Sequence, residues 1–404
     1  MTRLASIAIL CGLAAPLPYA MAQWTVTNLN PAGATESQIR GGSGGQQVGY
    51  AVIGGVQQAS MWSGTAASRV SLHPSGATGS QAYAISGAQQ VGVATVGGAS
   101  RAAVWTGSAA SWVNLDPPGS ASSIGKAIAG GHQYGFANVN LMRQASMWSD
   151  TAASWISLAP VNTTDSVINA AAGNQQVGVA GSPGSGTAAL WTGTASSYVN
   201  LILGSPIGGF PSAANGTDGV QQVGNASFIG NTAHAMLWSG SGASSVDLDP
   251  GGHNTPVGSI AYAVSGGIQV GWFNYMPTAQ THACLWTGSA ASMVDLHTFL
   301  PLNFDSSAAQ AIWSDANGTY IGGLAHNTAT NHTEAILWTR RAPCYANCDI
   351  STTPPVLNVL DFACFLNKFA AGDPDANCDG STTTPALNVL DFSCFLNAFA
   401  AGCS

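Results

Sequence analysis

The chain has 404 residues, of which only 6% are charged, and nine Lys and Arg face 17 Asp and Glu for a formal net charge of −8 at pH 7. A typical globular domain has about 25% charged residues, so solubility here must rest on hydroxyl groups, amides and backbone in turns. The sequence has no basic patch to neutralise phosphates, which excludes nucleic acid as an expected partner.

Residues 1–22 have the pattern of a secretory signal peptide. They contain Arg3, an apolar run from Leu4 to Leu17 and the small-residue ending Ala20-Met-Ala22. Such a segment is removed on export and is not a membrane anchor. No later stretch approaches the roughly 20 apolar residues that cross a bilayer. We therefore expect an exported chain, secreted or held at the cell surface, with no membrane span in its mature part.

Near-copies of one short motif, best seen in Arg101-Ala-Ala-Val-Trp-Thr-Gly107, recur seven times. Each copy has Ala three residues before a tryptophan and Met, Val or Leu directly before it. The tryptophans are Trp62, Trp105, Trp148, Trp191, Trp238, Trp286 and Trp338, which are 43, 43, 43, 47, 48 and 52 residues apart. A spacing this regular indicates stacked copies of one supersecondary unit.

Each unit is predicted to form four strands. One opens with Gln-Val-Gly, as at Gln90-Val-Gly92, or with the variant Tyr320-Ile-Gly322, and continues as an apolar run such as Val91 to Val96. A weaker strand precedes it, as in Ala82-Tyr-Ala-Ile85, the tryptophan motif is the next, and a Val-x-Leu pattern follows the tryptophan. Short apolar runs bounded by glycine are typical of strands. Four strands of about 5 to 6 residues, with loops of about 4 to 6, account for the period.

The two ends of the repeat array are complementary. The expected mature chain begins with Trp24-Thr-Val-Thr-Asn-Leu29, which resembles the Val-x-Leu strand at Trp112-Val-Asn-Leu115, and the seventh unit lacks that strand after Trp338. If the first strand fills the seventh sheet, the ring closes and only short protected edges remain. We predict an all-β fold over residues 23–342, a seven-bladed β-propeller of four-stranded antiparallel sheets closed by the N-terminal strand. The alternative, an open solenoid, needs a polar cap at each end.

The unit resembles the HAF-type extracellular repeat of bacterial exported proteins, named for a His-Ala-Phe triplet before Leu-Trp. The resemblance covers about 320 residues and is carried by Gln-Val-Gly followed by His234-Ala-Met-Leu-Trp238 or His282-Ala-Cys-Leu-Trp286. We call the position four residues before each tryptophan the polar slot. The other residues in the slot are Gln58, Arg101, Gln144, Thr187 and Glu334. We would look for a ligand at the slot and in the loops around the ring, because binding residues concentrate on loops over a rigid scaffold.

The composition changes in residues 343–404, where a second repeat has a period of 30. Each half runs from Asn-Cys-Asp-x-Ser to Leu-Asn-Val-Leu-Asp-Phe and continues with apolar residues at helical spacing up to Gly372 or Gly402. Cys284 remains in the propeller as an expected buried free thiol. Six cysteines of the tail predict three disulfides of open connectivity. They are Cys344, Cys348, Cys364, Cys378, Cys394 and Cys403.

The tail resembles the dockerin and EF-hand loop-helix, and more closely the GC-type dockerin tail of exported planctomycete proteins. The resemblance implies calcium held by loop oxygens. The implied ligands are Asn347, Asp349, Ser351, Asp361, Asn377, Asp379, Ser381 and Asp391. The first and last of each set are 14 residues apart, against about 11 in an EF-hand loop. The alternative is a disulfide-stapled helical pair that needs no metal.

The sequence shows no catalytic motif. It contains no His-Glu-x-x-His, no Gly-x-Ser-x-Gly, no phosphate-binding loop and no dinucleotide fingerprint before a helix. We therefore expect a non-enzymatic, monomeric exported protein, whose propeller binds an extracellular or cell-surface protein or glycan and whose tail serves attachment or sorting. The alternative is an extracellular polysaccharide hydrolase or lyase with its site in the propeller funnel.

Overall fold

The computed structural model describes residues 24–205, 211–228, 232–251, 258–275, 278, 280–341, 344–349, 351, 355–382 and 384–402. Two compact units are formed, one by Trp24–Arg340 and one that contains Arg341–Ser404. The predicted signal peptide, residues 1–22, lies outside the described residues. No helix in the described residues is both long enough and apolar enough to span a membrane.

The first unit consists of repeats of four antiparallel strands. In the second repeat these are β6 (Gly79–Ser86), β7 (Gln89–Val96), β8 (Ala99–Trp105) and β9 (Val113–Asn114), each paired with the next. The tryptophan that ends β8 is fully buried, as is its counterpart in every repeat. The predicted four-stranded antiparallel sheets are therefore confirmed. The last strand has only two residues instead of the expected five or six, because a 3-10 turn, Ala109–Ser111, occupies part of the connection.

The other repeats follow the same plan. Their strands are β2 (Ala34–Ser43), β3 (Gln46–Ile53), β4 (Val56–Trp62) and β5 (Val70–Ser71); β10 (Ser122–Ala129), β11 (His132–Val139), β12 (Met142–Trp148) and β13 (Ile156–Ser157); β14 (Asp165–Ala172), β15 (Gln175–Gly181), β16 (Thr187–Trp191) and β17 (Val199–Asn200); β18 (Ser212–Thr217), β19 (Gln222–Ser227), β20 (Ala233–Trp238) and β21 (Val246–Asp247); β22 (Ser259–Ser265), β23 (Ile268–Tyr275), β24 (Gln280–Trp286) and β25 (Val294–Asp295); and β26 (Phe304–Asp315), β27 (Gly318–Asn327) and β28 (His332–Arg341).

The N-terminal strand β1 (Thr25–Asn28) pairs antiparallel with β28, at the other end of the array. In this register Val26 lies opposite Trp338. The next residue after β1, Leu29, is fully buried, and its backbone N donates to the carbonyl of Ala335 at 2.8 Å. Strand β1 therefore takes the fourth place beside the three strands of the last repeat.

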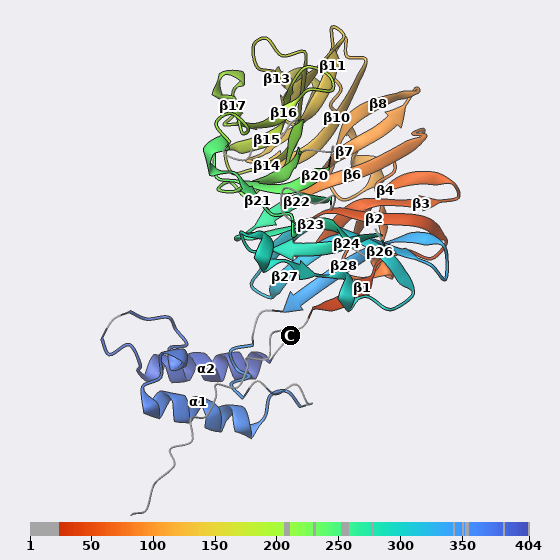
Figure 1. Cartoon of the computed structure of the whole chain (residues 1–404). Helices are drawn as coiled ribbons and strands as arrows, with labels where there is room; N and C mark the ends of the chain where they lie inside the picture. The colour runs from red at the N-terminus through yellow and green to blue at the C-terminus, as the bar shows by residue number, and fades with distance from the viewer. Residues whose placement is uncertain are drawn as a thin grey trace, which may run out of the picture. The chain divides into compact units, whose positions relative to one another are not determined.

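One hydrogen bond recurs between neighbouring repeats. The backbone N of the alanine three residues before each tryptophan donates to a buried serine hydroxyl in the first strand of the next repeat, at 2.9 to 3.0 Å. The pairs are Ala59–Ser80, Ala102–Ser123, Ala145–Ser166, Ala188–Ser212, Ala235–Ser259, Ala283–Ser307 and Ala335–Ser37. The last pair joins the seventh repeat to the first. The first strands of all repeats line one cavity, so the sheets radiate from a common axis as a β-propeller (Figure 1).

The Gln-Val-Gly motif has two structural roles. The side-chain oxygen of Gln90 accepts from Gly107 N at 2.8 Å and so holds the turn after the tryptophan. Gly92 lies opposite Ala82 of the first strand. In the seventh repeat the predicted match, Tyr320-Ile-Gly322, is shifted by one residue, because Gly323 is the glycine that lies opposite the corresponding alanine, Ala309.

The second unit contains the helices α1 (Val359–Ala371) and α2 (Val389–Ala401). Phe365 and Phe395 stack at its centre with ring centroids 4.1 Å apart. Disulfides Cys348–Cys364 and Cys378–Cys394 each tie a loop to the following helix. Cys344 is also disulfide-bonded, whereas Cys403 lies outside the described residues. In the propeller, Cys284 is a buried free thiol as expected.

Candidate functional site

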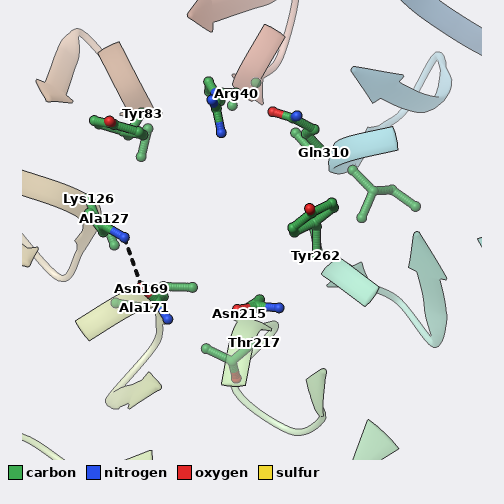
Figure 2. A pocket seen from close by; sticks show the side chains of 18 of the residues that line it. Arg40, Tyr83, Lys126, Ala127, Asn169, Ala171, Asn215, Thr217, Tyr262 and Gln310 are labelled. Atoms are coloured by element: carbon green, nitrogen blue, oxygen red, sulfur yellow. Dashed lines mark hydrogen bonds between the residues drawn. The ribbon is translucent and has the colours of Figure 1, made fainter. Parts of the chain in front are cut away.

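Seven side chains, one from the first strand of each repeat, line a cavity of about 200 Å³ on the propeller axis. We call them the channel ring; they are Arg40, Tyr83, Lys126, Asn169, Asn215, Tyr262 and Gln310. Figure 2 shows them pointing inward from separate strands. An adjoining cavity of about 220 Å³ shares the same residues. Ligand pockets measure roughly 300–1,000 Å³, so this space suits a small group or one sugar unit.

Each ring residue is the extra residue of a β-bulge. In β6 the pairing with β7 passes from Ala82 to Ala84 and leaves out Tyr83. The same interruption occurs at the ring position of every other repeat. A bulge bends the strand and re-aims one side chain, and bulges are frequent beside active sites. The propeller thus directs one side chain per repeat to the axis.

Small residues around the bulge make this geometry possible. A Cβ added to Gly92 would lie 1.9 Å from the carbonyl oxygen of Gln81, so β7 can approach the bulge only where it carries glycine. Gly or Ala also follows every ring residue directly. In six repeats the ring residue stands nine positions before the glycine of Gln-Val-Gly. A variable residue at a constant place between small ones is the sequence signal of the ring, and no catalytic motif contains it.

Hydrogen bonds hold several ring side chains in place. Lys126 Nζ donates to Asn169 Oδ1 at 3.0 Å, shown by the dashed line in Figure 2. The Nδ2 of Asn169 donates to the carbonyl of Ala214, and that of Asn215 donates to the carbonyl of Ala261, at 3.0 and 3.1 Å. Each of these two amides is thus bonded to the first strand of the next repeat, so the ring is preorganised before any ligand arrives.

The ring carries positive charge in a partly buried place. Burial, together with the charges of Arg143 and Arg40, lowers the pKa of Lys126 to about 8. Burial raises the pKa of Tyr83, which the nearby Arg40 opposes. The Arg40 guanidinium lies 5.8 Å from the centre of the Tyr83 ring. Among the described residues no carboxylate lies within 4.0 Å of the Arg40 or Lys126 nitrogens.

Two polar atoms of the ring lack partners. Arg40 Nε and Gln310 Oε1 are buried and form no hydrogen bond with any described residue. Figure 2 shows the two side chains next to each other. A buried polar atom without a partner costs about 1 to 3 kcal/mol, and native structures contain few of them. The Arg40 donor and the Gln310 acceptor could therefore both be satisfied by a ligand that offers an acceptor and a donor.

The polar slot before each tryptophan does not line the channel. Its side chains instead contact other residues of the same sheet. Arg101 forms an ion pair with Asp116, and Nδ1 of His282 lies 2.9 Å from Asp295 Oδ2. Structural contacts already occupy these groups, so the structure gives no support to a ligand at the slot, and that expectation stays a prediction.

The structure brings the predicted metal ligands of the tail together within each half. In the first half Asp361 accepts from Asp349 N at 3.2 Å, Ser351 N donates to Asp349 Oδ1 at 2.9 Å, and Asn347 Nδ2 donates to Ser351 O at 2.8 Å. The second half repeats these contacts at the same distances. Its residues are Asn377, Asp379, Ser381 and Asp391.

The fit of these loops to calcium is partial. Asn347 Oδ1 and Asn377 Oδ1 are buried and accept no hydrogen bond from a described residue, which leaves two oxygens open to a hard cation. Both oxygens of Asp361 already accept from backbone amides, because Asn358 N donates to the second at 2.8 Å. The described residues contain no group of three or more His, Cys, Asp and Glu that could hold a metal ion.

Comparison with known proteins concerns the fold. No family model and no curated protein matches the chain. Among solved structures it is similar to puromycin hydrolase, with 10% identity, a TM-score of 0.45 and coverage of 78% of this chain and 56% of that one. It is also similar to the β-propeller domain of the trilobed protease from Pyrococcus furiosus, with 9% identity, a TM-score of 0.47 and coverage of 76% of this chain and 97% of that one. A third similar structure is acylaminoacyl peptidase from Pyrococcus horikoshii, with 10% identity, a TM-score of 0.48 and coverage of 78% of this chain and 54% of that one. The chain spans about half the length of the hydrolase and the peptidase.

The expectation of a non-enzymatic binding or structural propeller is not upheld by this comparison: the similar structures include a puromycin hydrolase, the β-propeller domain of a protease, an acylaminoacyl peptidase and prolyl endopeptidases. The channel ring combines convergent polar groups with a lysine of lowered pKa, and these two features make it the candidate site. At 9 to 10% identity the similarity describes the fold alone. No peptidase activity is assigned to this chain.

Proposed function

We propose that the chain is an extracellular enzyme that cleaves polysaccharide, with its active site in the central channel. The proposal depends on one observation, the convergence of seven bulge-directed side chains on one cavity. Their amide, phenol and cationic groups can bond and orient sugar hydroxyls, and a few convergent polar groups in a concave site are typical of substrate binding.

The test is depolymerisation by the purified full chain. A panel of neutral and acidic polysaccharides is incubated with the protein, and chain length is followed by size-exclusion chromatography. We expect at least one polymer to shorten, Tyr83→Ala to abolish the effect, and the control Tyr275→Ala, outside the channel, to retain it. If every polymer keeps its length, or Tyr83→Ala is as active as the natural chain, the proposal fails.

We also propose that the propeller is a closed ring of seven blades. The pairing of β1 with β28 and the hydrogen bond from Ala335 N to Ser37 Oγ support closure. In a closed ring the junction between the last and first repeats contributes as much to the free energy of unfolding as any other junction. Ser37→Ala and Ser123→Ala should then lower the free energy of unfolding by similar amounts in urea titrations, whereas a silent Ser37→Ala would argue for an open array.

For the tail we propose calcium binding by the eight predicted ligands, in an exported chain of the kind that the HAF-type and dockerin resemblance implies. The open oxygens of Asn347 and Asn377 support this proposal. Calorimetric titration of the oxidised full chain should show binding at calcium concentrations on the order of millimolar or below. Asp361→Ala together with Asp391→Ala should remove that heat; the absence of any heat in the natural chain would eliminate the ligand set.

A further inference from the structure

The composition of the channel ring distinguishes between two ways of breaking a glycosidic bond. Hydrolysis by most glycosidases uses two carboxyl groups on either side of the bond, roughly 5 to 9.5 Å apart. The ring contains two cations, two phenols and three amides, and no carboxyl group lines either channel cavity. This composition is instead suited to a substrate that carries its own carboxylate.

We propose that the channel is a lyase site for uronate-containing polysaccharide, in which Arg40 binds the uronate carboxylate and Lys126 removes the proton from the adjacent carbon. This inference rests on the proposed function and deepens it by naming the substrate class and the reaction. Arg40 and Lys126 line the same cavity, one on each side of Tyr83 in ring order.

Arg40 and Gln310 supply the binding contacts. The open Arg40 Nε is a donor for a carboxylate oxygen, and a guanidinium is the side chain best matched to a carboxylate. The open Gln310 Oε1 accepts from a sugar hydroxyl. Arg40 interacts with Tyr50, whose hydroxyl donates to Glu36, but no described carboxylate lies within 4.0 Å of the guanidinium, which leaves room for a direct contact with the uronate carboxylate.

Lys126 lies in the cavity and has a pKa that suits a general base. Its Nζ is held by Asn169 Oδ1 at 3.0 Å, inside the cavity. Burial and two nearby arginines bring its pKa to about 8, so a substantial fraction is neutral under mildly alkaline conditions. A general base acts best with a pKa close to the working pH.

The reaction balances without another reactant. Neutral Lys126 takes the proton from C5 of the uronate, and the electron pair left on C5 forms the C4=C5 double bond. The C4–O bond of the glycosidic link breaks, and the departing oxygen takes the proton back from the Lys126 ammonium. Arg40 stabilises the extra negative charge that develops on the carboxylate in the transition state. The products are a new sugar hydroxyl and an unsaturated uronate, and the enzyme returns to its starting state.

The experiment uses the full chain with polygalacturonate and alginate as probes and dextran as the neutral control. Elimination appears as ultraviolet absorbance from the new double bond, and we expect it with a uronate polymer and not with dextran. The rate should rise as pH increases through about 8. Shortened polymer with new reducing ends but no unsaturation would preserve the proposed function and overturn this inference; unshortened polymer would overturn both.

Variants separate the roles of the two cations. Lys126→Met and Lys126→Arg should lower kcat by about 100-fold or more, the range of general acid–base catalysis, with little change in KM. Arg40→Gln should raise KM about 10-fold or more, as expected for loss of a charge-assisted contact of about 1.5 to 3 kcal/mol. Lys368→Met in the tail is the control and should leave both constants unchanged.

Urea midpoints confirm that each variant is folded before its rates are compared. If Lys126→Met does not fold, Lys126→Arg decides, because it keeps the charge and cannot act as the base. Elimination at the natural rate in Lys126→Arg, or an unchanged KM in Arg40→Gln, would overturn the assignment.

Discussion

Gly92 stands opposite the bulge that turns Tyr83 toward the axis, and a side chain at Gly92 would collide with that bulge. Gly92→Ala places a Cβ 1.9 Å from a backbone oxygen, which cannot move aside as a flexible side chain could. We expect the free energy of unfolding to fall by about 1 to 3 kcal/mol or more, the cost of overpacking. Gly45→Ala, where no atom lies within 4 Å and φ is not positive, is the control. Urea unfolding that shows equal losses in both variants would contradict the prediction.

Lys126 makes a testable contribution to stability. Its pKa is about 8 in the folded chain against an ordinary value of 10.5, so between these pH values the unfolded chain binds more protons. Stability must therefore rise with pH across this window. At pH 7 the charged lysine opposes folding, and Lys126→Met should stabilise the chain by about 1 kcal/mol, after allowance for screening of a partly exposed charge.

The measurement is urea unfolding of the natural chain and Lys126→Met at several pH values. The difference between them should shrink as pH increases from 8 toward 10.5. Lys368→Met serves as the control, since Lys368 is a tail residue paired with Asp375 at 3.3 Å. A difference that stays constant with pH would mean that burial does not disfavour the Lys126 charge.

The contact between neighbouring repeats depends on buried serines. Ser123 Oγ accepts from Ala102 N at 2.9 Å, across the junction of two repeats. Ser123→Ala leaves this amide buried without a partner, and we expect a loss of about 1 to 3 kcal/mol in chemical denaturation. Ser166→Ala at the next junction should cost a similar amount, and the exposed Ser63→Ala should be neutral. A neutral Ser123→Ala would show that apolar packing alone holds the repeats together.

The elements also show which features of a repeat can be predicted. Buried residues that recur in every repeat, such as Trp105 and Ala102 three residues before it, reveal the strand order, because their packing environment is the same in every repeat. The sequence predicts a longer outer strand than the observed Val113–Asn114, since an apolar alternation does not reveal the turn before it. The channel ring was missed for the opposite reason. Tyr83 and Lys126 occupy equivalent places with unrelated chemistry, so no repeated motif marks them.

For the whole molecule, the low charge content and the repeat architecture belong together. Each sheet buries its tryptophan against the neighbouring repeat; Trp105, for example, shares one core cluster with Val48 and Met61 of the preceding repeat. The stability of the fold is then a sum over similar junctions between repeats, and these junctions need few charged groups. Arg40 and Lys126, two of only nine Lys and Arg, both point to the axis. This allocation concentrates positive charge in the channel of an acidic chain.

The N-terminal segment gives the sharpest test of the whole fold. Leu29 N bonds to Ala335 O at 2.8 Å, and Leu72 N bonds to Ala59 O at the same distance within the first repeat. Both side chains are fully buried. If the start of the chain belongs to the last sheet, Leu29→Ala should lower the free energy of unfolding by about 2 to 5 kcal/mol, and Leu72→Ala should cost a similar amount.

The exposed Leu302→Ala is the control for both leucines and should change little. A dispensable N-terminal extension would make Leu29→Ala as silent as this control while Leu72→Ala remained costly. Loss of the first strand would also leave β28 as an unpaired edge, and exposed edges promote association between chains. Light scattering should therefore detect self-association of Leu29→Ala at intermediate urea concentrations. At the same concentrations Leu72→Ala should still be monomeric, because a substitution at Leu72 leaves β1 paired with β28.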